Sequence, residues 1–91
     1  MIQFVIKRSG AKESFDPEKI RSAVRLACRE GGVADEEVEK IADAVLNKIV
    51  QSAGERQEIK SVEIRNIALK ELDSSAPAAA AGWRTYEQAK R

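Results

Sequence analysis

Cations gather around one predicted turn near the start of the chain, where they could bind an anion. Lys7 and Arg8 are adjacent at the end of an apolar stretch, and Lys12 lies across a Ser-Gly turn. Lys19 is in the first turn of a predicted helix, where the helix dipole disfavours a positive charge. The free N–H groups at a helix start attract anions. A phosphate group bound at this junction would account for both the paired cations and the position of Lys19.

The same cations have a simpler interpretation. Charged side chains at the edge of a strand prevent edge-to-edge aggregation, and Lys19 would then be a solvated surface residue. Two cations beside a glycine turn are common, so their spacing by itself is a weak indication of a binding site. The residues alone leave both interpretations open.

The composition argues against catalysis. The chain has no histidine, which removes the commonest general base and a common zinc ligand. It also lacks the glycine-rich phosphate loop that ends in Gly-Lys-Ser/Thr. Neither a nucleophile nor a base accompanies the acidic residues near the predicted turn. We therefore expect no enzymatic activity, no catalytic residue and no metal site.

The charge balance and the cysteine count bear on partner and location. Lysine and arginine number 16 against 15 aspartate and glutamate residues, a formal net charge of +1. A module held to DNA by its overall field is normally more basic, so direct nucleic-acid binding is not expected and a small anionic ligand fits better. The single Cys28 cannot form an internal disulfide, in agreement with a cytoplasmic location. No apolar run approaches the roughly 20 residues of a membrane span.

A β-hairpin is predicted at the N-terminus. Its strands cover residues 2–7 and 12–15, and Gly10 supplies the positive φ that a tight turn needs. Side chains alternate along a strand, so Val5 and Lys7 share one face and Phe4 and Ile6 share the other. If Phe4 and Ile6 face the core, the side chains of Val5 and Lys7 point away from the core. The short segment 56–60 is a candidate third strand beside the hairpin.

Four helices follow from apolar residues at helical spacing. Asp16 is the predicted cap of the first helix, with Pro17 at its first position, and Asp35 and Ser61 are the predicted caps of the second and third. The predicted helices span residues 17–30, 36–53, 62–72 and 77–90. A chain of 91 residues supports one core, so we expect a single domain over residues 1–91. The predicted fold class is α+β, with a small N-terminal hairpin covering a four-helix bundle.

The last predicted helix combines small and aromatic residues. An alanine run at residues 78–81 favours helix and permits close packing of a neighbour. Trp83 and Tyr86 follow at helical spacing, and we expect both to pack in the core rather than to stack on a base.

The hairpin and the first helix together resemble the ATP-cone, the nucleotide-sensing domain of many ribonucleotide reductases and of the zinc-ribbon repressor of their genes. That family pattern is V-x-K-R-[DS]-G, then a Glu, then F-[DN]-x-x-K-I. The chain matches it at Val5, Lys7, Arg8, Ser9, Gly10, Glu13, Phe15, Asp16, Lys19 and Ile20. An Ile-x-[ST]-x-x-Ile segment at residues 59–64 and the closing aromatic helix extend the resemblance over essentially the whole chain.

The resemblance implies a binding site for ATP or dATP, with Mg²⁺ as a further candidate. Lys7 and Arg8 would bind the phosphates, joined by Ser61 and Lys90. These assignments follow from the family pattern and not from the composition of this chain.

The remaining implied contacts concern the base and the sugar. Val5 would meet the base through its backbone and side chain. Glu13 and Asp16 would hydrogen-bond near adenine or ribose, and Lys19 would bridge toward base or phosphate. Arg65 is where some relatives carry a residue near the sugar.

The function implied by the resemblance is that of a stand-alone adenine-nucleotide (ATP/dATP) sensor, linked to ribonucleotide reductase or to its regulation. The chain contains neither the catalytic barrel of the reductases nor the four cysteines of the zinc ribbon. A sensor acts through different affinities for two states, which implies a protein partner or self-association. The alternative is a small helical module that binds protein or nucleic acid through Lys7, Arg8, Lys12 and Lys19.

Overall fold

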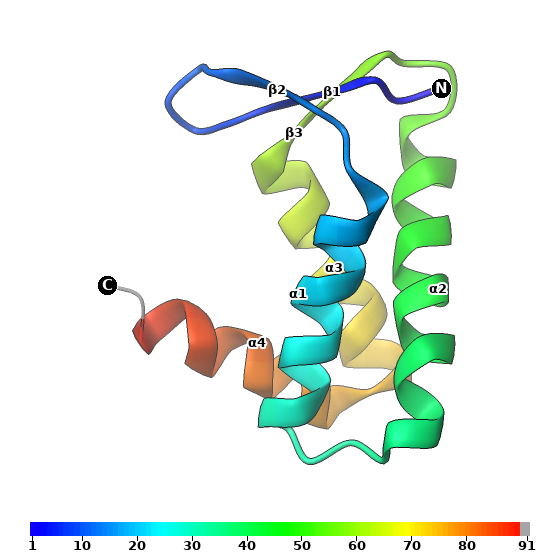
Figure 1. The fold of residues 1–91 in the computed structure, drawn as a ribbon, viewed down its shortest axis with the longest axis vertical. Helices are drawn as coiled ribbons and strands as arrows, with labels where there is room; N and C mark the ends of the chain where they lie inside the picture. Colours follow the sequence, from blue (N-terminus) through cyan, green and yellow to red (C-terminus); the bar gives the residue numbers. More distant parts are fainter. Residues whose placement is uncertain (90–91) are drawn as a thin grey trace.

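A small sheet lies across one end of the helices (Figure 1). The computed structural model describes residues 1–89. Strands β1 (Phe4–Ile6), β2 (Lys12–Ser14) and β3 (Glu58–Lys60) form the sheet in the order β2-β1-β3. β1 pairs with β2 in antiparallel register and with β3 in parallel register. The predicted hairpin and the candidate third strand are both confirmed.

The helices are α1 (Pro17–Glu30), α2 (Asp35–Ala53), α3 (Ser61–Ser75) and α4 (Pro77–Ala89). In Figure 1, α1 and α2 run along the long axis, whereas α4 turns to the side toward which the hairpin tip also extends. The predicted α+β class, a hairpin over four helices, is confirmed. Among residues 1–89, no helix combines the length and the apolar character that crossing a bilayer requires.

Two predicted helix caps are wrong. Ala34 and Lys60 hold the cap positions of α2 and α3, and Asp35 and Ser61 are the first helical residues. In α2, acidic side chains in the first turn stabilise the helix through its dipole without a capping hydrogen bond. In α3, the Glu63 carboxylate accepts a hydrogen bond from the backbone N–H of Lys60 at 3.3 Å. Glu63 thus satisfies the N–H of the cap residue itself.

One apolar core joins the sheet to the helices. Its largest fully buried side chains are Ile49, Ile59, Leu72, Val24, Val45 and Cys28. Ile59 is at the centre of β3, so this strand ties the sheet to the core beneath it.

α1 and α4 approach each other closely because small residues lie at their contact. A Cβ atom added to Gly82 of α4 would overlap with the carbonyl oxygen of Ala27, and one added to Gly31 would overlap with that of Ala78. Both obstacles are backbone atoms, so a side chain could not move them aside. The predicted close packing of the alanine-rich helix is confirmed, and it positions α4 beside α1.

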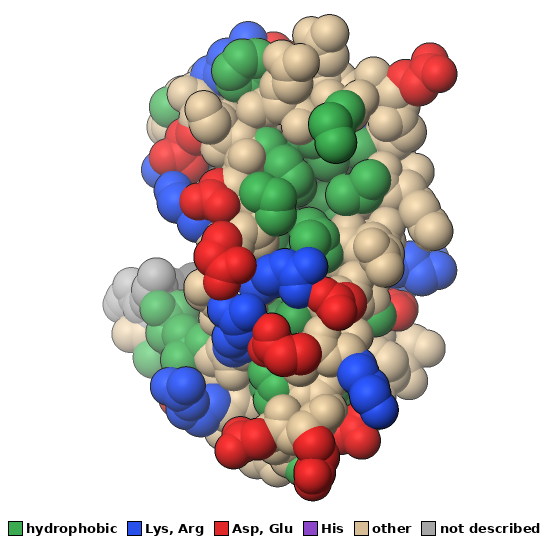
Figure 2. All heavy atoms as spheres, turned by 45° about the vertical axis from the view of Figure 1, so that its right-hand side comes forward, with side chains coloured by type: hydrophobic (Ala, Val, Ile, Leu, Met, Phe, Trp, Pro, Cys, Tyr) green, Lys and Arg blue, Asp and Glu red, His purple; other side chains and the backbone are tan. Residues whose placement is uncertain are grey.

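Ion pairs occupy the face formed by α1 and α2. Figure 2 shows lysine, arginine, aspartate and glutamate side chains intermingled below an apolar area on this face. Arg25 binds Glu39 at 2.9 Å and Glu18 at 2.6 Å, and Arg21 pairs with Asp43. Both arginines therefore already have carboxylate partners and are not free to bind an anionic ligand.

Candidate functional site

A cavity of about 170 Å³ lies beneath the sheet, where the hairpin, the start of α1, α3 and α4 meet. We call it the hairpin cavity. Four residues implied by the family pattern line it together: Val5, Glu13, Asp16 and Lys19. Most of the remaining lining is apolar, including Phe15 from the segment before α1. The fold therefore brings four of the five residues predicted near the base and sugar to one place, and Arg65 is the exception.

Strand pairing explains how Val5 and Glu13 meet there. They are directly opposite each other in the β1–β2 register, and opposite residues project from the same face of a sheet. Phe4 lies on the outer face, where the ammonium of Lys12 is 4.6 Å from the centre of its ring. Of the two faces that alternation allows, the one that carries Val5 packs against the core, so the condition that Phe4 faces the core is not met.

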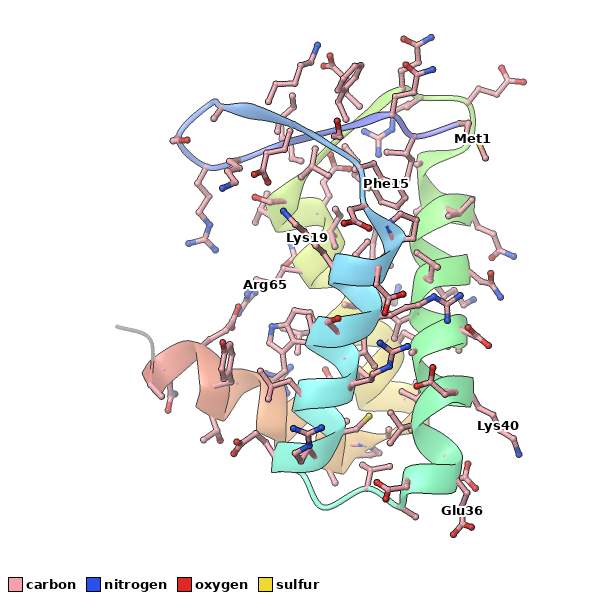
Figure 3. The ribbon with its side chains drawn as sticks, viewed as in Figure 1. Met1, Phe15, Lys19, Glu36, Lys40 and Arg65 are labelled. Carbon is pink, nitrogen blue, oxygen red and sulfur yellow. The ribbon has the colours of Figure 1, made fainter. Side chains whose placement is uncertain are left out.

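The start of α1 fixes the next two residues. Asp16 accepts a hydrogen bond from the backbone N–H of Glu18 at 3.0 Å, which confirms it as the helix cap. Lys19 follows one turn later and forms no ion pair within residues 1–89. Figure 3 shows its side chain leaving α1 on the side that the hairpin overhangs. An uncompensated ammonium group thus borders the hairpin cavity.

The two cations of the turn are held differently. The Lys7 ammonium lies 3.2 Å from the Glu13 carboxylate, which anchors it beside the hairpin cavity. Arg8 is exposed at the turn and has no ion-pair partner among the described residues. The pKa of Glu87, in the last turns of α4, is lowered chiefly by its hydrogen bonds with Arg65, and the charge of Arg8 adds a smaller contribution. Lys7 is therefore paired beside the cavity, whereas Arg8 acts on the described part of the chain only through its charge.

The remaining predicted residues do not line the hairpin cavity. Ser61 begins α3. Arg65 lies one turn further, and its guanidinium donates hydrogen bonds of 2.7 and 2.9 Å to the two carboxylate oxygens of Glu87. Figure 3 shows Arg65 reaching from α3 toward α4, below Lys19. Lys90 lies outside the described residues.

Several lining residues were missed by sequence reasoning. Ala23 of α1 and Ile64 of α3 complete the hairpin cavity together with Trp83 of α4. Trp83 packs against the core as expected, yet it also forms a wall of this cavity. Tyr86 was expected in the core and is 36% exposed. The only sequence signal for Trp83 was an aromatic residue in the closing helix, which does not distinguish a cavity wall from core packing.

A second hollow continues from the first between α1 and α4. This α1–α4 cavity measures about 270 Å³ and shares Ala23 and Trp83 with the hairpin cavity. Tyr86 and Glu87 also line it. Within residues 1–89, no cluster of three or more His, Cys, Asp or Glu side chains forms a candidate metal site.

Comparison with known proteins identifies the family. The family described as the ATP cone domain matches residues 3–91, nearly the whole chain. The chain belongs to the ATP-cone family. The resemblance expected from the hairpin motif is confirmed, and ATP-cone domains in general bind ATP or dATP. Membership of this family thus indicates nucleotide binding as the general class of function.

Curated relatives add a second finding. The chain is 38% identical over 69 residues to the transcriptional repressor NrdR of Thermosipho melanesiensis, covering 76% of this chain and 44% of the relative. It is 37% identical over 68 residues to NrdR of Sorangium cellulosum (75% and 43%) and 38% identical over 68 residues to that of Thermomicrobium roseum (75% and 41%). The chain spans less than half the length of these three relatives.

The names of the relatives correct one expectation. They are transcriptional repressors, a class of protein that acts on DNA, which contradicts the expectation against direct nucleic-acid binding. That expectation rested on a net charge of +1. The net charge of one domain is a weak criterion, because contacts to DNA phosphates depend on local clusters of cations and on every domain of the protein.

Proposed function

We propose that the protein is an adenine-nucleotide sensor of one ATP-cone unit over residues 1–91, with its base site in the hairpin cavity. The observation that carries this proposal is the convergence of Val5, Glu13, Asp16 and Lys19 on a mostly apolar cavity, with the cation Lys7 bound to Glu13 at its border. An apolar hollow with a few placed polar groups is the usual form of a small-ligand site. Membership of the ATP-cone family supports the nucleotide as ligand.

The base would enter between the sheet and α1. Val5 and Phe15 offer apolar contact, and Trp83 offers an aromatic edge or face. Ionised Glu13 and Asp16 can only accept hydrogen bonds, which suits the amino group of adenine and the hydroxyl groups of the sugar.

The phosphates would extend toward the turn. Lys7, Arg8 and Lys19 supply positive charge there, and charge-assisted hydrogen bonds to phosphate are among the strong ones. Ser61, Arg65 and Lys90 are proposed as further contacts to phosphate or sugar. Mg²⁺ binds through phosphate oxygens and retains several waters, so it would enter this site with the triphosphate.

The proposed role is regulatory and not catalytic. Asp16 is engaged as a helix cap and Glu13 as the partner of Lys7, so neither is set up to activate a water molecule. Bound nucleotide would order the hairpin against α4 and alter a surface that a partner protein or a second copy recognises. The similarity to transcriptional repressors supports a link to the control of transcription, in the setting of ribonucleotide reductase that the family implies.

A second candidate function is contact with nucleic acid. The names of the relatives favour it, and the cations of the hairpin could meet a phosphate backbone as well as a nucleotide.

We expect ATP or dATP to raise the melting temperature by about 10 °C or more. A ligand that binds only the folded state at a hundredfold excess over Kd stabilises it by about 2.7 kcal/mol, which corresponds to a shift of this size in a small domain. The measurement is a thermal melt with ATP, dATP and GTP, with and without Mg²⁺. A folded sample that does not respond to millimolar ATP or dATP contradicts the sensor proposal. A response to a short DNA duplex and not to nucleotide favours the second candidate.

Filling the hairpin cavity should weaken binding of the base without unfolding the protein. Ala23 is an exposed residue of α1 that lines both cavities, so Ala23→Leu adds apolar volume where the base would lie. We expect at least a tenfold loss of affinity for ATP, AMP and adenosine alike, measured by calorimetry, with little change in the melting temperature without ligand.

The matched control is Ser22→Leu, the same residue placed at the neighbouring exposed position, which lines neither cavity. Unchanged affinity in Ala23→Leu, or equal losses in both variants, would place the base elsewhere.

A further inference from the structure

The carboxylate of Glu87, which lines the α1–α4 cavity, binds the guanidinium of Arg65. Both oxygens of Glu87 accept hydrogen bonds from the Arg65 guanidinium, at 2.7 and 2.9 Å. A hydrogen bond from the side chain of Trp83 and the charge of Arg8 act on the same carboxylate. The pKa of Glu87 is lowered from its ordinary value, chiefly by the hydrogen bonds to Arg65, so the group is held as an anion.

The Arg65 guanidinium that holds Glu87 would also suit a phosphate. Arginine binds carboxylate and phosphate with the same two-pronged geometry, and the ring N–H of Trp83 would add to it. Arg65 belongs to α3 and Trp83 to α4, and the charge of Arg8 at the hairpin turn has a smaller electrostatic effect on Glu87. Trp83 also walls the hairpin cavity, so this cluster borders the proposed base site.

The Arg65–Glu87 pair is exchangeable. About a third of each side chain is exposed, so water and a ligand can reach the pair from outside. Glu87 also lines the α1–α4 cavity, which shares two lining residues with the hairpin cavity. A phosphate extending from a base in the hairpin cavity would meet this carboxylate, and two anions cannot both bind the same guanidinium edge.

We propose that Glu87 is a positioning residue that takes the place of a phosphate group on Arg65 and must be displaced by a bound nucleotide. The inference rests on the proposed function. Glu87 would then influence which adenine ligand is preferred. A triphosphate carries enough negative charge to replace the Glu87 carboxylate on Arg65 and to outweigh the repulsion between the two anions. Adenosine has no phosphate to compete for Arg65 and would leave the pair intact.

The test compares Glu87→Gln with the wild type by isothermal titration calorimetry, using ATP and adenosine. Glutamine keeps the size of the side chain and removes the charge, so Arg65 is released. We expect Glu87→Gln to bind ATP about fivefold to tenfold more tightly than the wild type, with adenosine affinity unchanged. In an Arg65→Ala background, the same substitution should raise ATP affinity by less than it does in the wild type.

A matched control is Asp73→Asn. Asp73 of α3 receives two hydrogen bonds of 3.0 Å from Arg84 of α4, so it forms a second two-pronged pair between the same helices, and neither residue lines the two cavities. We expect Asp73→Asn to leave ATP affinity unchanged. Equal gains in Asp73→Asn and Glu87→Gln would indicate general loosening of α4 and would overturn the inference.

The remaining outcomes separate this inference from the proposed function. Unchanged or weaker ATP binding by Glu87→Gln, with normal binding by the wild type, overturns the role of Glu87 alone. Absence of ATP binding by the wild type overturns both proposals at once.

Discussion

The double variant Lys7→Ala/Arg8→Ala is expected to bind ATP about a hundredfold more weakly than the wild type while remaining folded. Charge-assisted hydrogen bonds contribute about 1.5–3 kcal/mol each, and about 1.4 kcal/mol corresponds to a tenfold change in affinity. Both side chains are exposed, and the Lys7–Glu13 pair is half exposed, so their removal should cost little folding stability. Calorimetry with ATP and a urea titration without ligand measure the two quantities.

AMP and a distant lysine provide the controls. If Lys7 and Arg8 bind the outer phosphates, their loss should weaken ATP binding far more than AMP binding. Lys40 is on α2 at the end of the molecule opposite the hairpin (Figure 3), so Lys40→Ala should leave both affinities unchanged. Equal losses for ATP and AMP would show that the cations do not read the outer phosphates. A large loss of stability with unchanged binding would mean that they hold the hairpin instead.

Gly82→Ala is expected to destabilise the protein by about 3 kcal/mol, because it forces α4 away from α1. The added methyl group would overlap with the backbone carbonyl of Ala27, and overpacking of this kind costs about 1–3 kcal/mol or more. In a helix with open space, the same substitution would instead stabilise by about 1 kcal/mol. A urea titration measures the free energy of unfolding, and the sign of its change distinguishes the two cases.

The reverse change at the neighbouring position serves as control. Ala81 is exposed on α4, so Ala81→Gly should lower the free energy of unfolding by only about 1 kcal/mol through helix propensity. A Gly82→Ala variant as stable as the wild type would show that α4 can shift on α1 at little cost. The close contact would then not be what positions Trp83 beside the hairpin cavity.

Local signals predicted most of the elements correctly. The Asp16 cap, the glycine at the hairpin turn and the apolar spacing of each helix depend on residues within a few positions of one another, which is the range over which capping and periodicity act. The failures have the same origin. Asp35 and Ser61 have the chemistry of helix caps, yet each helix begins one residue earlier than expected, and local residue chemistry does not determine a boundary to a single position.

For the candidate site, the sequence by itself determined the cations at the turn, their spacing from the helix cap and the membership of the family. The tertiary structure decided which face of β1 points inward, since alternation defines two faces and only packing of Val5 against the core selects one. It also brought Trp83 to the hairpin cavity and joined Arg65 to Glu87, which are 22 positions apart in the chain. Trp83 reaches the cavity through the crossing of α1 and α4, where Gly82 removes the side chain that would hold the helices apart, and Arg65 meets Glu87 where α3 lies beside α4. No local pattern encodes that crossing, because it depends on how two complete helix surfaces fit together.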